Sequence, residues 1–111
     1  MGQETVATDE IGLGFVPRLR GDIEFVPVGD EAVLYEAGTG GMHQLDPIAA
    51  VVCGFIDGQR RLGEVIDELD QIFDESKTTI EADVLWLVRH LGGKGLLEGV
   101  APADGEAPDG S

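Results

Sequence analysis

The chain has three side chains suited to metal binding or nucleophilic catalysis: the imidazoles of His43 and His90 and the thiol of Cys53. They are far apart in the sequence and show none of the close spacings, such as CxxC or HxxxH, that bind a metal ion. Cys53 lies in a nearly all-apolar run, where cysteine packs as a small hydrophobe, and no neighbouring base activates it. We therefore expect no metal site and no cysteine chemistry.

Two further clusters could suggest chemistry. The glycine run at 38–41 lacks the lysine and the strand-to-helix setting of a phosphate-binding loop, so it predicts a hairpin turn. The acidic residues between 64 and 74 fall on the polar face of an amphipathic helical pattern, which is typical of a solvated surface. No catalytic triad or nucleotide-binding fingerprint is present, so the sequence predicts a non-catalytic protein without a cofactor.

Charge excludes several classes of partner. The 111 residues carry a net charge of −15, with 22 acidic and 7 basic residues. We expect no binding to nucleic acid or to an anionic membrane, because phosphate recognition needs clustered Lys and Arg. No apolar run approaches the roughly 20 residues of a membrane span, the N-terminal residues do not resemble a signal peptide, and a lone cysteine forms no internal disulfide. These features predict a cytoplasmic protein.

The first half of the chain is predicted to form strands and the second half helices. Residues 23–28, 32–36 and 42–45 are β-rich and separated by turn residues, which predicts an antiparallel meander. Asp46-Pro47 predicts a helix start, and apolar residues then recur at helical spacing in 47–56, 62–73 and 80–91, with Thr78 and Glu81 as a capping box for the last helix. The expected fold is α+β and winged-helix-like, with the domain over 15–100 between a flexible arm (1–14) and a disordered acidic tail (101–111).

Two predicted surfaces stand out. The third strand, Met42-His43-Gln44-Leu45, is short and uncharged, and at a sheet edge its free N–H and C=O groups can accept another chain. The third helix carries Leu85 and Trp86 outside its core stripe, on opposite margins, and tryptophan is a favoured interface anchor. Two interpretations stay open for these helix residues: ordinary edge packing, with Trp86 covered by the N-terminal arm, or a binding surface.

The ordered combination of motifs resembles the PqqD-like family, small recognition elements that bind the leaders of ribosomally synthesised, post-translationally modified peptides. The resemblance covers residues 17–98 and departs from the family pattern at Arg61, where a Thr usually caps the second helix. It rests on Pro17-Arg18-Leu19-Arg20, Leu45-Asp46-Pro47-Ile48-Ala49, Asp57-Gly58 with Leu62 to Ile66, Asp83-Val84 with Leu87, Val88 and Leu91, and Gly95-Leu96-Leu97.

The resemblance implies a peptide-binding module. In the family, the leader of a precursor peptide adds as a strand beside the third strand, against the third helix, and is presented to a modifying enzyme such as a radical SAM enzyme or a leader peptidase. On this basis Trp86 is assigned to docking of the partner enzyme. The residues assigned to peptide binding are Met42, His43, Gln44 and Leu45 on the strand and Val84, Leu85, Val88 and Arg89 on the helix, with Arg89 as a charge partner for an acidic leader residue.

Two alternatives compete with this interpretation. An acidic winged-helix adaptor would bind a basic protein partner through its negative strands and second helix, and its affinity would fall steeply with salt. An acidic carrier protein would be modified at Ser76, although the three strands before the helices count against it.

Overall fold

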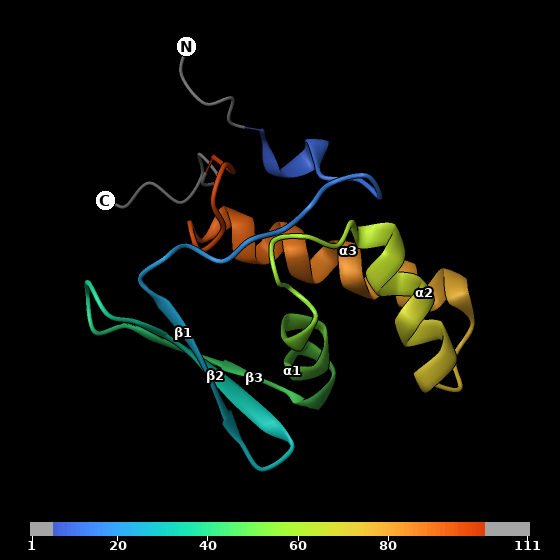
Figure 1. Ribbon diagram of the computed structural model, residues 1–111, viewed down its shortest axis with the longest axis horizontal. Coiled ribbons are helices and arrows are strands. Elements are labelled where there is room, and N and C mark those ends of the chain that lie inside the picture. Colours follow the sequence, from blue (N-terminus) through green and yellow to red (C-terminus); the bar gives the residue numbers. More distant parts are fainter. Residues whose placement is uncertain (1–5, 102–111) are drawn as a thin grey trace.

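The computed structural model describes residues 6–101, and its sheet comes first along the chain (Figure 1). Strands β1 (Ile23–Val28), β2 (Glu31–Glu36) and β3 (Met42–Leu45) are antiparallel and lie in the order β1-β2-β3. Both connecting turns use a glycine with positive φ, Gly29 at 65° and Gly40 at 79°, which glycine adopts without steric cost. The predicted meander is confirmed, and β3 lies at an edge of the sheet.

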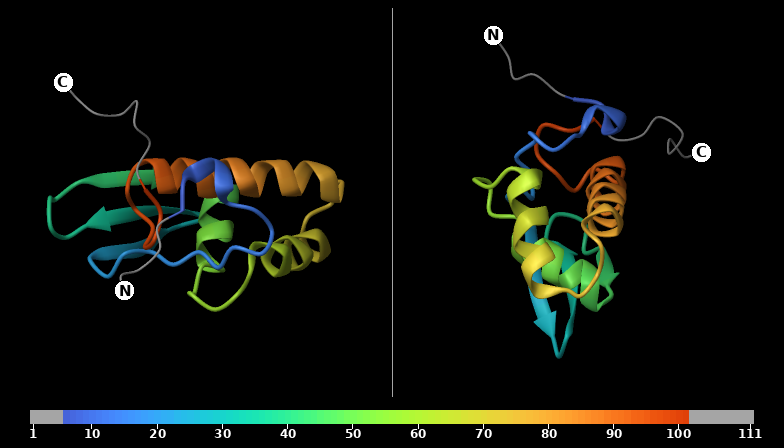
Figure 2. Two further views of the ribbon diagram at one scale, coloured as in Figure 1. Left: turned by 90° about the horizontal axis from the view of Figure 1, so that it is seen from above. Right: turned by 90° about the vertical axis from the view of Figure 1, so that its right-hand side faces the viewer.

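Three helices follow the sheet, which confirms the α+β class: α1 (Pro47–Gly54), α2 (Leu62–Ile72) and α3 (Lys77–Gly93). A short 3-10 helix, η1 (Thr8–Glu10), precedes the sheet. Helix α1 packs on the sheet, and α2 packs on α3. Figure 2 shows α3 running along one side of the molecule. None of the helices in residues 6–101 has the length and apolar character needed to cross a membrane.

The core lies between the helices and the inner face of the sheet. Ala32, Leu34 and Leu45 are buried on that face, and α2 contributes Leu62, Val65, Ile66 and Leu69. Ile72, the last residue of α2, follows the same helical pattern but is 57% exposed. The outer face of the sheet is uncovered, so Val26, Val28 and Met42 are exposed there.

Side chains cap two of the helices. The Asp46 carboxylate accepts the N–H of Ala49 at 2.8 Å, as predicted for the start of α1. Helix α3 is capped two residues earlier than expected, because the Ser76 hydroxyl accepts the N–H of Thr79 at 3.2 Å and the helix begins at Lys77. The predicted cap at Thr78 is therefore wrong, since Ser76 already satisfies an N–H of the first turn.

Helix α2 is capped by the chain that precedes the sheet. The residue at its N-cap, Arg61, makes no capping bond with its side chain. Instead the N–H groups of Leu62 and Gly63 donate to the main-chain oxygens of Phe15 and Leu13, both at 2.9 Å. The first N–H groups of α2 thus find main-chain acceptors, although Arg61 lacks the side-chain hydroxyl with which a Thr would cap the helix.

The segment expected as a free arm packs on the domain where the structure describes it. Ile11 is fully buried, and Val6 forms a bridge with Val100. The packed structure thus includes residues before Phe15, among them Val6 and Ile11. Residues 1–5 of the expected arm and 102–111 of the expected tail lie outside the described residues.

Candidate functional site

The free edge of β3 presents the main-chain groups of Met42 and Gln44. The N–H of Glu36 donates to the oxygen of Gly41 at 2.8 Å, so these residues form a pair whose main-chain groups face each other across the two strands. Such pairs alternate along an antiparallel ladder, so the next one is formed by Leu34 and His43. His43 therefore points its main-chain groups to β2, whereas Met42 and Gln44 point theirs outward.

The opposite edge of the sheet is less suited to another strand. Val28 and Glu31 flank the two-residue turn and form its hydrogen-bonded pair. The main-chain groups of the next residue, Pro27, therefore point away from β2, toward the free edge of β1. Proline has no N–H to donate, and it is tolerated on edge strands for this reason. The N–H of Ile23 is already donated to the oxygen of Arg20 at 3.0 Å. Strand addition is therefore favoured at β3.

An open cavity of about 320 Å³ separates β3 from α3. A second cavity of about 250 Å³ continues it along α3 toward the start of that helix. The two share Asp46, Ala49, Trp86 and Leu87, and we call them together the β3–α3 groove. Besides the shared residues, the groove is lined by His43, Gln44, Leu45, Ile48, Val52, Asp83, His90, Leu91 and Lys94.

Trp86 is the largest exposed apolar side chain of the groove. It is 63% exposed and lines both cavities. Its ring stacks on the His90 ring, with centroids 4.7 Å apart and an angle of 10° between the planes. This stacking supports the indole at the surface, where it offers a flat apolar face to a ligand.

The other α3 residues assigned from the sequence lie away from the groove. Val84 and Val88 are buried in the core, at 1% and 0% exposure, and Leu85 is half-buried against it. The Arg89 guanidinium donates to the main-chain oxygen of Ile11 at 2.9 and 3.3 Å. The chain's own N-terminal segment thus covers that margin of α3, and the open margin is the one that carries Trp86.

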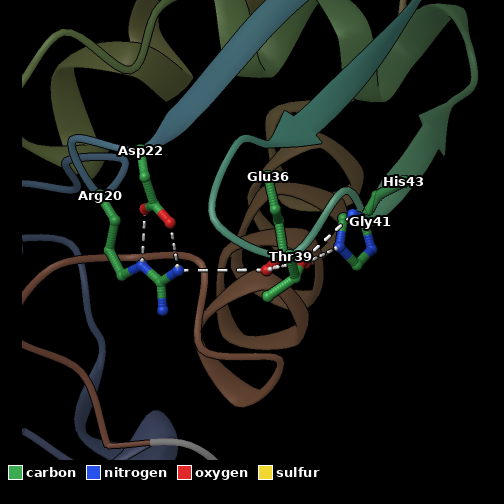
Figure 3. Close-up of polar contacts among 6 residues, drawn as sticks. All are labelled: Arg20, Asp22, Glu36, Thr39, Gly41 and His43. Atoms are coloured by element: carbon green, nitrogen blue, oxygen red, sulfur yellow. Dashed lines mark hydrogen bonds and ion pairs between the residues drawn. The ribbon is translucent and has the colours of Figure 1, made fainter.

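A polar network at the β2–β3 turn holds His43 in the groove wall (Figure 3). His43 Nε2 lies 2.5 Å from Glu36 Oε2, and the hydroxyl of Thr39 donates to Glu36 at 3.3 Å. On its other side Glu36 Oε1 is 4.0 Å from the Arg20 guanidinium, which also binds Asp22 at 3.1 Å. The hydrogen bond with His43 is the main cause that lowers the pKa of the Glu36 carboxyl, so Glu36 is an anion that fixes the His43 ring.

Cys53 is not part of the groove. It is buried on α1, and burial raises the pKa of its thiol to about 12. Within residues 6–101, no three His, Cys, Asp or Glu side chains gather as a metal site would require.

The folded protein is expected to resist thiol reagents. At pH 8 a thiol with a pKa near 12 is ionised in only about one molecule in 10⁴, and the thiolate is the reactive form. A disulfide reagent such as DTNB should therefore react with Cys53 over hours or slower in the folded protein and within minutes in guanidinium chloride. Equally fast reaction in both conditions would contradict the buried position.

Comparison with known proteins points to one family. The family model described as coenzyme PQQ synthesis protein D (PqqD) matches residues 31–97, which span β2, β3 and the helices α1, α2 and α3. The solved structure of TbiB1 in complex with the TbiA(beta) leader peptide matches with a TM-score of 0.68 and 26% sequence identity. That match covers 76% of this chain and 98% of the other. No curated protein sequence matches.

Proposed function

This chain belongs to the PqqD family, and from that premise we propose that it binds the leader segment of a ribosomally synthesised precursor peptide and presents it to a modifying enzyme. The observation that carries the proposal is the free edge of β3 beside an apolar groove. The likeness to TbiB1, which is solved with a leader peptide, supports it.

The proposed mode of binding is strand addition. The outward N–H and C=O groups of Met42 and Gln44 would pair with the main chain of the leader, which provides affinity without regard to its side chains. Alternate leader side chains would then face the groove, where Trp86 and Leu87 select apolar groups.

The peptide-binding residues are revised accordingly. On the strand we retain Met42, His43, Gln44 and Leu45. On α3 the geometry supports Trp86, Leu87, His90 and Leu91 in place of the four residues assigned from the sequence, because these line the groove. Trp86 is thereby reassigned from enzyme docking to peptide binding.

In this proposal the protein has no chemistry of its own. It would act in the cytoplasm, where precursor peptides are synthesised, and would hold the leader for a separate enzyme. A radical SAM enzyme or a leader peptidase fits this role, as the family resemblance implies.

Titration with the leader peptide encoded beside this gene, followed by NMR, tests the proposal. We expect chemical-shift changes in residues 42–45 and 86–94, and a loss of affinity under about tenfold between 50 and 500 mM NaCl, because apolar and main-chain contacts are weakly screened. Shifts confined to α2, or binding that salt abolishes, would favour the acidic adaptor instead.

A further inference from the structure

We propose that the β3–α3 groove selects its peptide by charge polarity, taking an acidic side chain at the Lys94 end and a basic side chain at the Asp83 end. This inference rests on the proposed function and specifies the peptide that the groove accepts. It follows from the two ends of the groove, which carry opposite charges, and from the apolar stretch between them.

The Lys94 end of the groove carries a cation open to a ligand. Lys94 lines the first cavity together with His43 and His90, and its side chain is exposed. No ion pair among residues 6–101 involves Lys94. The carboxylate of Glu36, which contacts His43 in the groove wall, is already paired with His43 and lies 4.0 Å from Arg20. An Asp or Glu of the peptide would thus meet an uncompensated positive charge.

The opposite end is acidic. Asp83 and Asp46 line the second cavity, and no Lys or Arg lines it. Asp46 caps α1, whereas Asp83 makes no ion pair within residues 6–101. Beyond it, Asp83 and Glu75 border a small cavity of about 70 Å³. The other residues that line this small cavity are apolar: Ile48, Val52, Leu69, Phe73, Ile80 and Val84.

This combination suits a Lys or Arg side chain. An aliphatic stem can lie in the small apolar cavity while its charged end stays at the rim beside Asp83 and Glu75. A purely aliphatic side chain would fill the cavity but leave the two carboxylates without a partner. The middle of the groove is formed by apolar Ala49, Trp86 and Leu87 together with Asp46, whose carboxylate already caps α1, so it favours apolar leader residues.

Geometry sets the spacing of the two charged peptide residues. Asp83 lies on α3 and Lys94 is the C-cap of that helix, so the two are eleven residues apart along its axis, or roughly 16 Å at 1.5 Å per residue. An extended strand covers that length in about five residues at 3.3 Å each. Strand β3 runs toward Asp46 and the Asp83 end of the groove. Because only alternate leader side chains face the groove, an antiparallel leader would carry its basic residue about four or six positions before its acidic one.

Charge reversal at each end provides the test. Lys94→Glu and Asp83→Lys are each expected to weaken binding of the leader encoded beside the gene by about threefold to tenfold, measured by calorimetry at low salt. Arg61→Glu at the N-cap of α2 and Asp70→Lys on α2 change the net charge by the same amounts outside the groove, and both are expected to bind like the wild type. A leader whose acidic residue is replaced by lysine should regain affinity for Lys94→Glu.

The outcomes separate this inference from the proposed function. If the wild type binds the leader through β3 but both reversals bind like their α2 controls, the charge polarity is wrong and leader binding stands. If each reversal changes the affinity as much as its α2 control and in the same direction, with opposite directions for the negative and the positive pair, overall charge acts and the inference is also overturned. If the wild type does not bind the leader, the proposed function itself fails.

Discussion

Replacing Trp86 with alanine is expected to weaken leader binding by about 30-fold or more. The indole is the largest exposed apolar group in the groove and lines both of its cavities, and tryptophan at the centre of an interface typically contributes about 2 kcal/mol or more. The free protein should keep its fold, because a side chain that is 63% exposed contributes little to the core. Calorimetric titration gives the affinity, and thermal unfolding followed by circular dichroism checks the fold.

Ile72→Ala is the matched control for this experiment. Ile72 is also a large, exposed apolar residue, at 57%, but it ends α2 and lines neither cavity of the groove. We expect its affinity to equal that of the wild type. Wild-type affinity in the Trp86 variant would show that the peptide does not lie along this margin of α3.

Replacing Gln44 with proline is expected to reduce leader binding by about 100-fold or more. The N–H of Gln44 points away from β2, so proline leaves the β2–β3 ladder intact, as it does at other sheet edges. It removes an outward donor and places its ring where the added strand would lie. Calorimetry measures the loss, and NMR spectra of the variant show whether β3 is retained.

Gln44→Thr separates the main chain from the side chain. This variant keeps the N–H and loses only an exposed side-chain bond from Gln44 to Glu31 of 3.2 Å, so its affinity should stay within about twofold of the wild type. If a folded Gln44→Pro variant binds as well as the wild type, the peptide occupies the groove without joining the sheet.

The strands can be predicted from the sequence because their signals are local. Alternating β-rich segments and turn residues such as Gly29 and Gly40 determine a meander, and a meander places its third strand at an edge. Met42 to Leu45 can therefore be assigned to the candidate site from the residue pattern alone. The start of α1 is equally predictable, because Asp46 and Pro47 act within a single turn.

The residues of α3 cannot be assigned in the same way. A helix with one core stripe has two margins, and apolar Leu85 and Trp86 stand on opposite ones, so periodicity alone does not show which margin faces β3. Contacts between distant parts of the chain determine which margin is open. Arg89 binds the main chain of Ile11, 78 residues away, so the N-terminal segment covers the margin of α3 that carries Arg89. The capping of α2 by Leu13 and Phe15 escapes prediction for the same reason.

Amide hydrogen exchange on β3 tests the central claim most directly. In the free protein the amides of Met42 and Gln44 should exchange quickly, whereas His43 and Leu45 donate to β2 and should be protected. With the leader bound at saturation, exchange at Met42 and Gln44 is expected to slow at least about tenfold while His43 and Leu45 change little. Unchanged exchange at Met42 and Gln44 under saturation, with new protection on α2, would contradict strand addition at this edge.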